Sequence, residues 1–448
     1  MRDRPPLPPG PYLVVGLARS GAAAARALLA HGEVMGCDVG RPAEAEALAA
    51  AGADVRLESD GLELLPRART VVKSPGVPAA APAIAAARAQ GVEVVGELEL
   101  AWRMLPNEFV AVTGTNGKTT TVELVAAIHR AARLPVAVAG NVGTALASLV
   151  GPDGPGPEAT VVCEASSFQL DDAVAFAPET AVLLNLTEDH IDRHGSFAAY
   201  RDAKLRVFAH QRLRDVAVLP HGFAAPPGEA RVVSFGPAEA ADLACVGGTL
   251  RWEGADLVPA EEIRLRGAHN LSNAMAASAA ALARGTDPDA VRAALRTFAG
   301  VPHRLEEVAE RAGVLFVNDS KATNPDSARV GIEAFPGGVH AILGGSRKGG
   351  RFRSLRQPVA ERCRAAYLVG DAAEQLAADL EGTAPVVRCG TLADAVERAA
   401  AAARPGEVVL LSPACASFDA FASFEHRGAA FRELARRLPG AEAPAPTG

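Results

Sequence analysis

Short apolar runs alternate with alanine-rich helical stretches along most of this chain of 448 residues. In residues 11–98 each apolar run ends at a glycine, an acid or a Ser-Pro-Gly turn. Strands that are separated by helices pair in parallel, and such sheets bind ligands at the carboxyl ends of their strands. The pattern therefore predicts a Rossmann-like N-terminal domain over residues 1–98, with strands at Tyr12–Val15, Val34–Cys37, Thr70–Lys73 and Val92–Val95.

The pattern changes twice further along the chain, and the length suits about three domains of 100–200 residues. Residues 99–301 hold apolar strands such as Thr160–Glu164 and then a β-rich stretch, in which we expect Ile263–Arg266 to be a strand. Residues 302–448 return to alternating strands and helices, and end in a predicted helix from Phe424 to Leu438. The whole chain is therefore predicted to be α/β.

Composition and charge exclude two classes of partner. The net charge of −7 gives no electrostatic case for nucleic-acid binding. Apolar runs stay shorter than the ~18 residues that a membrane span requires. The first residues, MRDRPPLPPGPY, lack the apolar core of a secretory signal and are predicted to be a short flexible lead. Six scattered cysteines without a Cys-x-x-Cys pair indicate reduced thiols in the cytoplasm.

The stretch FVAVTGTNGKTTTVEL, residues 109–124, joins a buried strand to a helix through a glycine-containing turn. Backbone N–H groups of such a turn converge on an anion together with the first donors of the helix. Lys118 supplies a charge for the outer phosphates of a nucleotide, and the Thr119 hydroxyl is a magnesium ligand. The general phosphate-loop pattern would place its first glycine at Val112, yet Gly-Lys-Thr in this context still predicts an ATP site.

Other polar residues also follow strand ends in the central segment. Glu164 ends the strand where a further magnesium ligand is expected, and His190 follows the next strand end among three carboxylates. A single histidine is more often structural, but this position favours a place on the same rim. Lys204, on a predicted helix, indicates by itself only a solvated lysine. Two asparagines in HNLSN open a long helix, either as caps or as contacts to a nucleotide base.

The first turn of the chain, Gly16–Gly21, is similar to a dinucleotide fingerprint, but Ala18 replaces its middle glycine. The methyl group of Ala18 hinders the close approach of a pyrophosphate, which disfavours NAD even though Asp38 lies where a ribose-binding acid would. A nucleotide held by another part of the molecule and a βαβ unit without any ligand both stay open.

Lys321, Lys348 and Ser417 follow strand ends in the third segment, so they can share one edge of a sheet. Polar residues at such positions either lie in solvated loops or bind an anion or a carboxylate. An ATP-splitting domain between two α/β domains suits one chemistry in particular. A carboxylate attacks the γ-phosphate of ATP, and an amine then captures the acyl phosphate, while magnesium and Lys118 neutralise the two anions.

Several motifs in series resemble one known family, the Mur ligases. The motifs, in chain order, are GTNGKTT, GNVG, EASSFQL, NLTEDHIDRH, the Lys204 segment, HNLSNA, PHR, NDSKATNPDS and SPACASFDAF. The last two resemble the members that add D-glutamate to UDP-N-acetylmuramoyl-L-alanine in peptidoglycan synthesis, releasing ADP and phosphate. The resemblance implies an N-terminal Rossmann-like domain for the UDP-substrate (1–98), a central P-loop domain with a mixed sheet for ATP (99–301) and a C-terminal Rossmann-like domain for the amino acid (302–448).

The resemblance also implies roles for individual residues. Two Mg²⁺ ions are implied. Thr119 and Glu164 would hold one, and His190 would hold the other together with Lys204, which CO₂ would have carbamylated. The catalytic residues implied are Lys118, Glu164, His190 and Lys204. The ATP contacts implied are Gly114, Thr115, Asn116, Gly117, Lys118, Thr119, Thr120, Asn273, Arg304 and Asp319. Those to the UDP-substrate are Arg19, Ser20, Asp38, Ser74, Asn141 and His190, and those to D-glutamate are Thr323, Lys348, Ser417 and Phe424.

Three alternatives to a D-glutamate-adding ligase remain. The chain could be another amide ligase of the family, namely the enzyme that adds L-alanine, a diamino acid or a dipeptide, or the folyl polyglutamate ligase, although the DNPR-like segment expected of a diamino-acid enzyme is absent. A non-catalytic ATP-dependent switch would not need Glu164, His190 and Lys204 together. A nicotinamide oxidoreductase is disfavoured by Ala18. Val39 after Asp38 leaves the uracil contacts open. We expect a cytoplasmic monomer with small-molecule substrates.

Overall fold

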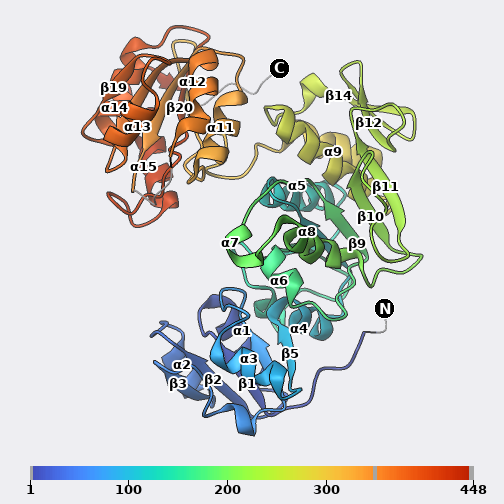
Figure 1. Cartoon of the computed structure of the whole chain (residues 1–448). Helices are drawn as coiled ribbons and strands as arrows, with labels where there is room; N and C mark the ends of the chain where they lie inside the picture. The colour runs from blue at the N-terminus through green and yellow to red at the C-terminus, as the bar shows by residue number, and fades with distance from the viewer. Residues whose placement is uncertain (1–3, 347–350, 443–448) are drawn as a thin grey trace. The chain divides into compact units, whose positions relative to one another are not determined.

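The computed structural model describes residues 4–346 and 351–442. It divides into two compact units, Met1–Ala260 with Ser272–Arg296, and Glu261–Leu271 with Thr297–Gly448. Its described residues form three sheets, and each sheet lies within one of the three predicted segments (Figure 1). The predicted α/β class, with one sheet in each segment and a mixed sheet in the central one, is therefore confirmed, while the domain boundaries themselves stay predictions.

The N-terminal sheet is parallel and has the strand order β3-β2-β1-β4-β5. The direction in which successive strands are added to this sheet reverses between β1 and β4. Such a reversal leaves a crevice for a ligand at the carboxyl ends of these two strands. The elements are β1 (Tyr12–Val15), α1 (Arg19–Leu28), β2 (Val34–Asp38), α2 (Ala45–Ala50), β3 (Asp54–Leu57), η1 (Leu65–Arg67), β4 (Thr70–Lys73), α3 (Pro82–Ala89), β5 (Glu93–Gly96) and α4 (Glu97–Met104).

The central sheet is mixed, with the order β14-β13-β12-β11-β10-β9-β6-β8-β7. Strands β6 to β12 pair in parallel, and β12 to β14 form an antiparallel extension. The elements are β6 (Phe109–Thr113), α5 (Lys118–Ala131), β7 (Val136–Gly140), η2 (Leu146–Leu149), β8 (Thr160–Glu164), α6 (Ser167–Asp171), β9 (Thr180–Leu183), α7 (Ile191–His194), α8 (Phe197–Leu205), η3 (Arg206–Phe208), β10 (Val216–Pro220), β11 (Arg231–Gly236), β12 (Leu243–Val246), β13 (Thr249–Trp252), β14 (Ala255–Pro259), η4 (Ala260–Glu262), α9 (Ala268–Leu282) and α10 (Pro288–Thr297).

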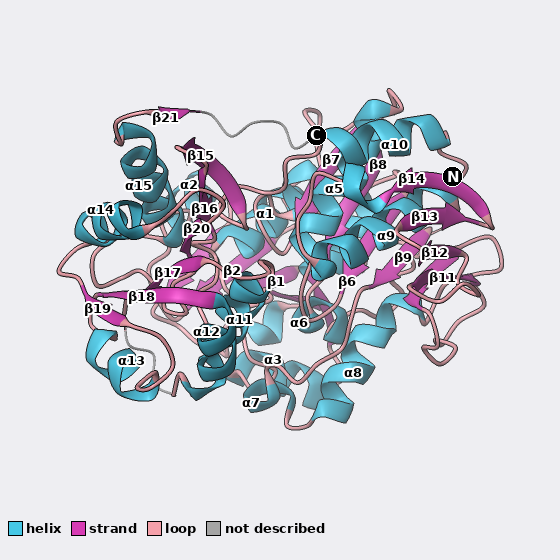
Figure 2. Cartoon of the chain, turned by 90° about the horizontal axis from the view of Figure 1, so that it is seen from above, coloured by secondary structure: helices cyan, strands magenta, loops and turns pink. Residues whose placement is uncertain are grey.

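The third sheet has the order β19-β18-β17-β20-β16-β15-β21, with β15 and β21 antiparallel at one edge. Figure 2 shows helices on both faces of this sheet. The elements are β15 (Glu306–Arg311), β16 (Val314–Asn318), α11 (Pro325–Glu333), β17 (Val339–Gly344), η5 (Arg353–Leu355), α12 (Arg356–Arg362), β18 (Cys363–Val369), α13 (Ala373–Asp379), β19 (Val386–Arg388), α14 (Leu392–Ala402), β20 (Val408–Leu411), α15 (Phe424–Arg437) and β21 (Ala441–Glu442).

One apolar cluster runs from β1 and α1 through α4 into β6 and β8, so the first two sheets share a continuous core. Trp102 on α4 meets Phe176 edge-on, with ring centroids 5.7 Å apart. Small side chains, mostly alanine and valine, fill the remaining volume. Because burial of apolar area is the main stabilising term, this shared core fixes the N-terminal sheet against the P-loop sheet.

Two local predictions were wrong. From residue 4 onward the N-terminal lead is held against the protein: Arg4 donates to the carbonyl oxygen of Trp102 at 2.6 Å and lies over the Trp102 and Phe109 rings. Residues Ile263–Arg266 form no strand, although their apolar alternation favoured one. The β-rich stretch is instead completed by β12 and β14. Across the described residues, none of the helices has the length and apolar character that a membrane crossing requires.

Candidate active site

The phosphate turn, residues 114–117, joins the fully buried strand β6 to the start of α5. Gly117 has a φ of +85°, and a Cβ there would lie 2.2 Å from Oδ1 of Asn273, which only a glycine can accommodate. The Lys118 ammonium folds back over the turn and donates to the carbonyl oxygens of Gly114 (3.0 Å) and Thr115 (2.9 Å). The turn therefore presents a cation and the helix N-terminus at one place.

Glu164 lies at the carboxyl end of β8, beside the phosphate turn. Strands β6 and β8 pair in register, with Val112 opposite Glu164. The Thr119 hydroxyl donates to Oε2 of Glu164 at 2.6 Å, and the Asn141 amide donates to Oε1 at 3.1 Å. A hydroxyl and a carboxylate that meet in this way are the hard oxygen donors that Mg²⁺ prefers, so the residues present fit a magnesium ion.

The buried side chain of Lys204 extends from α8 to the phosphate turn. Its ammonium donates to the carbonyl oxygen of Gly114 at 2.7 Å and lies 4.7 Å from the centre of the Tyr200 ring. Burial, and then the nearby Lys118 charge, lower the pKa of Lys204 to about 7. A large fraction of this amine is therefore neutral at physiological pH, unlike the solvated lysine that the sequence pattern alone indicated.

His190 is half-exposed and immediately precedes α7, with a left-handed φ of 52°. Its ring lies 4.9 Å from the Phe168 ring, and Nε2 lies 3.4 Å from Oδ2 of Asp189. His194 stacks on the same Phe168 and contacts the Ser167 hydroxyl at 3.0 Å. In the described part of the chain, groups of three or more His, Cys, Asp or Glu that could hold a metal do not occur.

A cavity of about 420 Å³ lies at the carboxyl ends of β1, β2 and β4 and is closed by residues of the GNVG loop. It is lined by all of the predicted UDP-substrate residues except His190, namely Arg19, Ser20, Asp38, Ser74 and Asn141. The Asp38 carboxylate accepts from the backbone of Leu17 (2.7 Å) and Gly40 (2.8 Å), so it shapes the first turn itself. Gln169 also lines this cavity; the prediction missed it, although it lies in the EASSFQL motif.

Three of the residues predicted in the third segment, Asp319, Thr323 and Ser417, lie on the loops that follow β16 and β20. Asp319 is buried and accepts from the Ser412 hydroxyl at 2.8 Å, and burial raises its pKa to about 7. Ser417 is buried, and Phe424 begins α15 with Lys321 3.9 Å from its ring centre. Thr323 lies on the loop after β16, Arg304 lines a cavity of about 240 Å³, and Lys348 lies outside the described residues.

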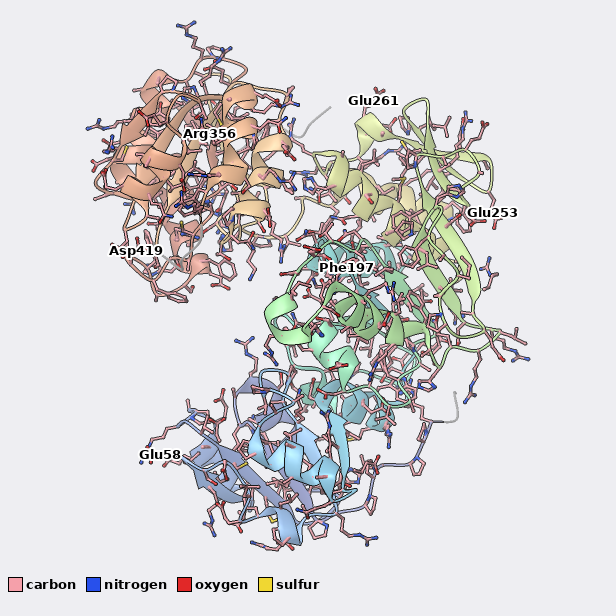
Figure 3. All side chains as sticks on the ribbon, in the orientation of Figure 1. Glu58, Phe197, Glu253, Glu261, Arg356 and Asp419 are labelled. Atoms are coloured by element: carbon pink, nitrogen blue, oxygen red, sulfur yellow. The ribbon has the colours of Figure 1, made fainter. Side chains whose placement is uncertain are left out.

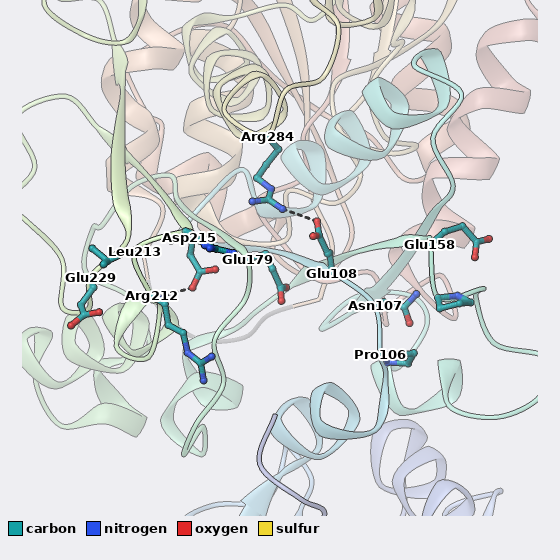
Figure 4. Close-up of a pocket in the computed structure, with 12 residues that line it drawn as sticks. Pro106, Asn107, Glu108, Glu158, Glu179, Arg212, Leu213, Asp215, Glu229 and Arg284 are labelled. Atoms are coloured by element: carbon teal, nitrogen blue, oxygen red, sulfur yellow. Dashed lines mark hydrogen bonds and ion pairs between the residues drawn. The ribbon is translucent and has the colours of Figure 1, made fainter. Parts of the chain in front are cut away.

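A larger cavity of about 880 Å³ lies at the opposite, amino-terminal edge of the central sheet (Figure 4). Two of its acids, Glu108 and Glu179, already have partners within the protein. Arg284 contacts Glu108 at 2.8 Å, and the backbone of Phe109 donates to Glu179 at 2.8 Å. Figure 3 shows side chains that end in nitrogen or oxygen around the outside of the ribbon, among them Glu58 and Glu253. The size of a cavity alone therefore does not identify the active site. The candidate site lies instead at the strand ends around Gly114.

Fold and site together define a protein of three α/β sheets with a P-loop nucleotide site at the edge of the central sheet. The chain belongs to the Mur ligase family. Family models match in order: the Mur ligase MurD-like N-terminal domain at residues 11–96, the Mur ligase middle domain at 112–281, and the Mur ligase glutamate ligase domain at 303–415.

Relatives and solved structures agree with this placement. The UDP-N-acetylmuramoylalanine–D-glutamate ligase of Acidobacterium capsulatum is 43% identical over 96% of this chain and 97% of its own. The ligase of the same name from Anaeromyxobacter dehalogenans is 45% identical over 94% and 96%. The crystal structure of UDP-N-acetylmuramate-alanine ligase MurC from Thermotoga maritima has the same fold, with a TM-score of 0.59 at 19% identity over 94% of this chain and 98% of that one.

Proposed function

We propose that this protein is an ATP-dependent ligase that adds D-glutamate to UDP-N-acetylmuramoyl-L-alanine. The observation that carries the proposal is the near full-length likeness to relatives named for this reaction, at 43% and 45% identity. The geometry supports it, because Lys118 and Lys204 both donate to the Gly114 carbonyl oxygen beside Thr119 and Glu164.

In the proposed reaction, an oxygen of the L-alanyl carboxylate attacks the γ-phosphorus of ATP, and the bond to the β-phosphate oxygen breaks to release ADP. The D-glutamate amine then attacks the carbonyl carbon of the acyl phosphate and loses a proton, and inorganic phosphate leaves. Lys118 offsets the charge of the phosphates, and Gly114, Thr115, Asn116, Gly117 and Thr120 present the turn and the helix start. Mg²⁺ held by Thr119 and Glu164 would reduce the repulsion between the two anions.

We propose that Lys204 is carbamylated. Its neutral amine attacks the carbon of CO₂, and one proton is released as the carbamate forms. The lowered pKa of Lys204 supports this step, since only the uncharged amine is a nucleophile. The carbamate would add the anionic oxygen that a second magnesium ion needs beside His190.

The UDP part of the substrate is proposed to lie in the cavity lined by Arg19, Ser20, Asp38, Ser74 and Asn141, with His190 as a further contact. We propose Asn273, Arg304 and Asp319 as further ATP contacts. The residues proposed for D-glutamate are Thr323, Lys348, Ser417 and Phe424. Free thiols at all six cysteines support a reducing compartment, and we propose a cytoplasmic monomer.

An ADP-release assay tests the function. The purified protein is given ATP, Mg²⁺ and UDP-N-acetylmuramoyl-L-alanine with one of D-glutamate, L-glutamate, a diamino acid or D-alanyl-D-alanine. A further arm supplies UDP-N-acetylmuramate with L-alanine. We expect turnover with D-glutamate alone. Turnover in another arm and none with D-glutamate would assign a different ligase of the family, and ATP hydrolysis that no amine stimulates would indicate an ATP-dependent switch.

A further inference from the structure

Lys73 and Asp172 form a buried ion pair across 99 residues of sequence. Nζ of Lys73 lies 2.5 Å from Oδ2 of Asp172, and the two side chains are only 4% and 3% exposed. Arg88 on α3 reaches the other carboxylate oxygen, Oδ1, at 3.2 Å. Charges removed from water in this way need close partners, because an unpaired buried charge is strongly unfavourable. The pair therefore holds its two backbone segments in a defined relation.

The surrounding backbone leaves room for the pair. Gly96 on β5 lies opposite Lys73 in the parallel register, and a Cβ at Gly96 would lie 3.0 Å from Cβ of Asp172. Asp172 itself follows the carboxyl end of α6, where a carboxylate does not stabilise a helix. Its place is thus explained by Lys73 and Arg88 rather than by α6.

Both residues of the pair are close in sequence to residues that line the 420 Å³ cavity. Ser74, which follows Lys73, lines the cavity from β4, and its hydroxyl donates to the carbonyl oxygen of Gly16 at 2.9 Å. Gln169, three residues before Asp172, lines the same cavity from α6. The Gln169 amide oxygen accepts from the backbone of Ser166 at 3.0 Å, so this helix start is rigid.

We infer that Lys73 and Asp172 are positioning residues that hold the β4 wall and the α6 wall at the spacing required by the uridine-nucleotide substrate. The inference rests on the proposed function, since it assigns that substrate to the cavity. It gives this ion pair a role in substrate specificity rather than in stability alone.

The test is steady-state kinetics of the full-length protein, with each substrate varied in turn, for Lys73→Met, Asp172→Asn and the double variant. We expect the KM for UDP-N-acetylmuramoyl-L-alanine to rise roughly tenfold or more, because a misplacement of about 1 Å can cost up to about a hundredfold. The KM values for ATP and D-glutamate should change by less than about twofold. The double variant should be no worse than the poorer single variant, since the two residues act as one unit.

Arg67→Met is the matched control. It removes exposed ion pairs with Glu33 and Asp54 in the N-terminal segment and should leave every KM unchanged. A fall in melting temperature of the pair variants with an unchanged KM for the uridine substrate would overturn the inference alone. A wild-type protein without turnover of that substrate would overturn the proposed function as well.

If Asp172→Asn does not fold, Arg88→Met takes its place, because the Arg88 side chain is 46% exposed and contacts the same carboxylate. The same KM should then rise about twofold to threefold, the range of a partly exposed ion pair. An unchanged KM in Arg88→Met would count against the inference in that case.

Discussion

The ammonium nitrogen of Lys204 lies 2.7 Å from the carbonyl oxygen of Gly114, which also accepts from Lys118 at 3.0 Å. Two lysines from different helices thus converge on one carbonyl of the phosphate turn. Burial, and then the nearby Lys118 charge, lower the pKa of Lys204, so its proton is held weakly. This relationship links the nucleotide site to a lysine that the sequence pattern by itself placed on the surface.

Carbamylation of Lys204 gives a prediction with two readouts. In ¹³C-bicarbonate, the wild-type protein should show a carbamate carbon signal in NMR, and the signal should grow as pH rises through about 7, since the amine loses its proton there. Lys204→Ala should lose the signal and the activity, and short carboxylates should restore part of the activity. Lys321→Ala is the control and should keep the signal. A signal that persists in Lys204→Ala would contradict the assignment.

Gly117→Ala tests the close approach of Asn273 to the phosphate turn. The added Cβ would lie 2.2 Å from Oδ1 of Asn273 at a φ of +85°, so the turn or the asparagine must move. We expect the KM for ATP to rise at least about tenfold, since the backbone donors are displaced. Gly222→Ala has a similar φ of +80° but open space around it, and should leave the KM for ATP unchanged. Equal effects of both variants would argue against a role for Asn273.

Asp319 should make stability depend on pH. Burial raises its pKa from 3.8 to about 7, so between these values the folded protein binds more protons than the unfolded chain. The stabilisation from this group is thus complete below about pH 4 and is lost as pH rises to about 7. Each unit of pKa shift corresponds to about 1.4 kcal/mol in the free energy of unfolding. The melting temperature of Asp319→Asn should therefore increase relative to that of the wild type as pH rises. Asp326 is an exposed acid on α11, so the melting temperature of Asp326→Asn should depend on pH in the same way as that of the wild type.

Ser417→Ala addresses the proposed D-glutamate site. Loss of a hydroxyl that binds a charged substrate group costs about 1.5–3 kcal/mol, roughly tenfold to a hundredfold in KM for D-glutamate. The KM for ATP should stay nearly constant. Ser354→Ala, at an exposed position of η5, is the control and should behave as the wild type. A parallel rise in both KM values would place Ser417 outside the amino-acid pocket.

Much of the fold could be predicted because parallel strands buried on both faces are continuous apolar runs, as in Phe109–Val112. Strand β3 (DVRL) escaped prediction because it is a polar edge strand. Ile263–Arg266 shows the converse error, because alternation over four residues does not specify a strand without partners. The Arg4 contacts with Trp102 were equally hidden, since no local pattern indicates a partner 98 residues away.

The candidate site shows the same division. Turn residues such as Gly117 and Lys118 are contiguous, so their motif predicts them directly. The pairing of Lys73 with Asp172 and the low pKa of Lys204 depend on burial by distant segments, which only the folded chain reveals. Gln169 could have been found from its place in EASSFQL, beside the capping Ser166.

Transfer of ¹⁸O from substrate to phosphate tests the central claim most directly, namely that the phosphate turn activates a carboxylate as an acyl phosphate. UDP-N-acetylmuramoyl-L-alanine labelled with ¹⁸O in its carboxylate is turned over with ATP and D-glutamate, and the released phosphate is analysed by mass spectrometry. We predict one ¹⁸O atom per phosphate for each amide bond formed, and no labelled phosphate from Lys118→Ala. Amide formation by the wild type with unlabelled phosphate would contradict the account.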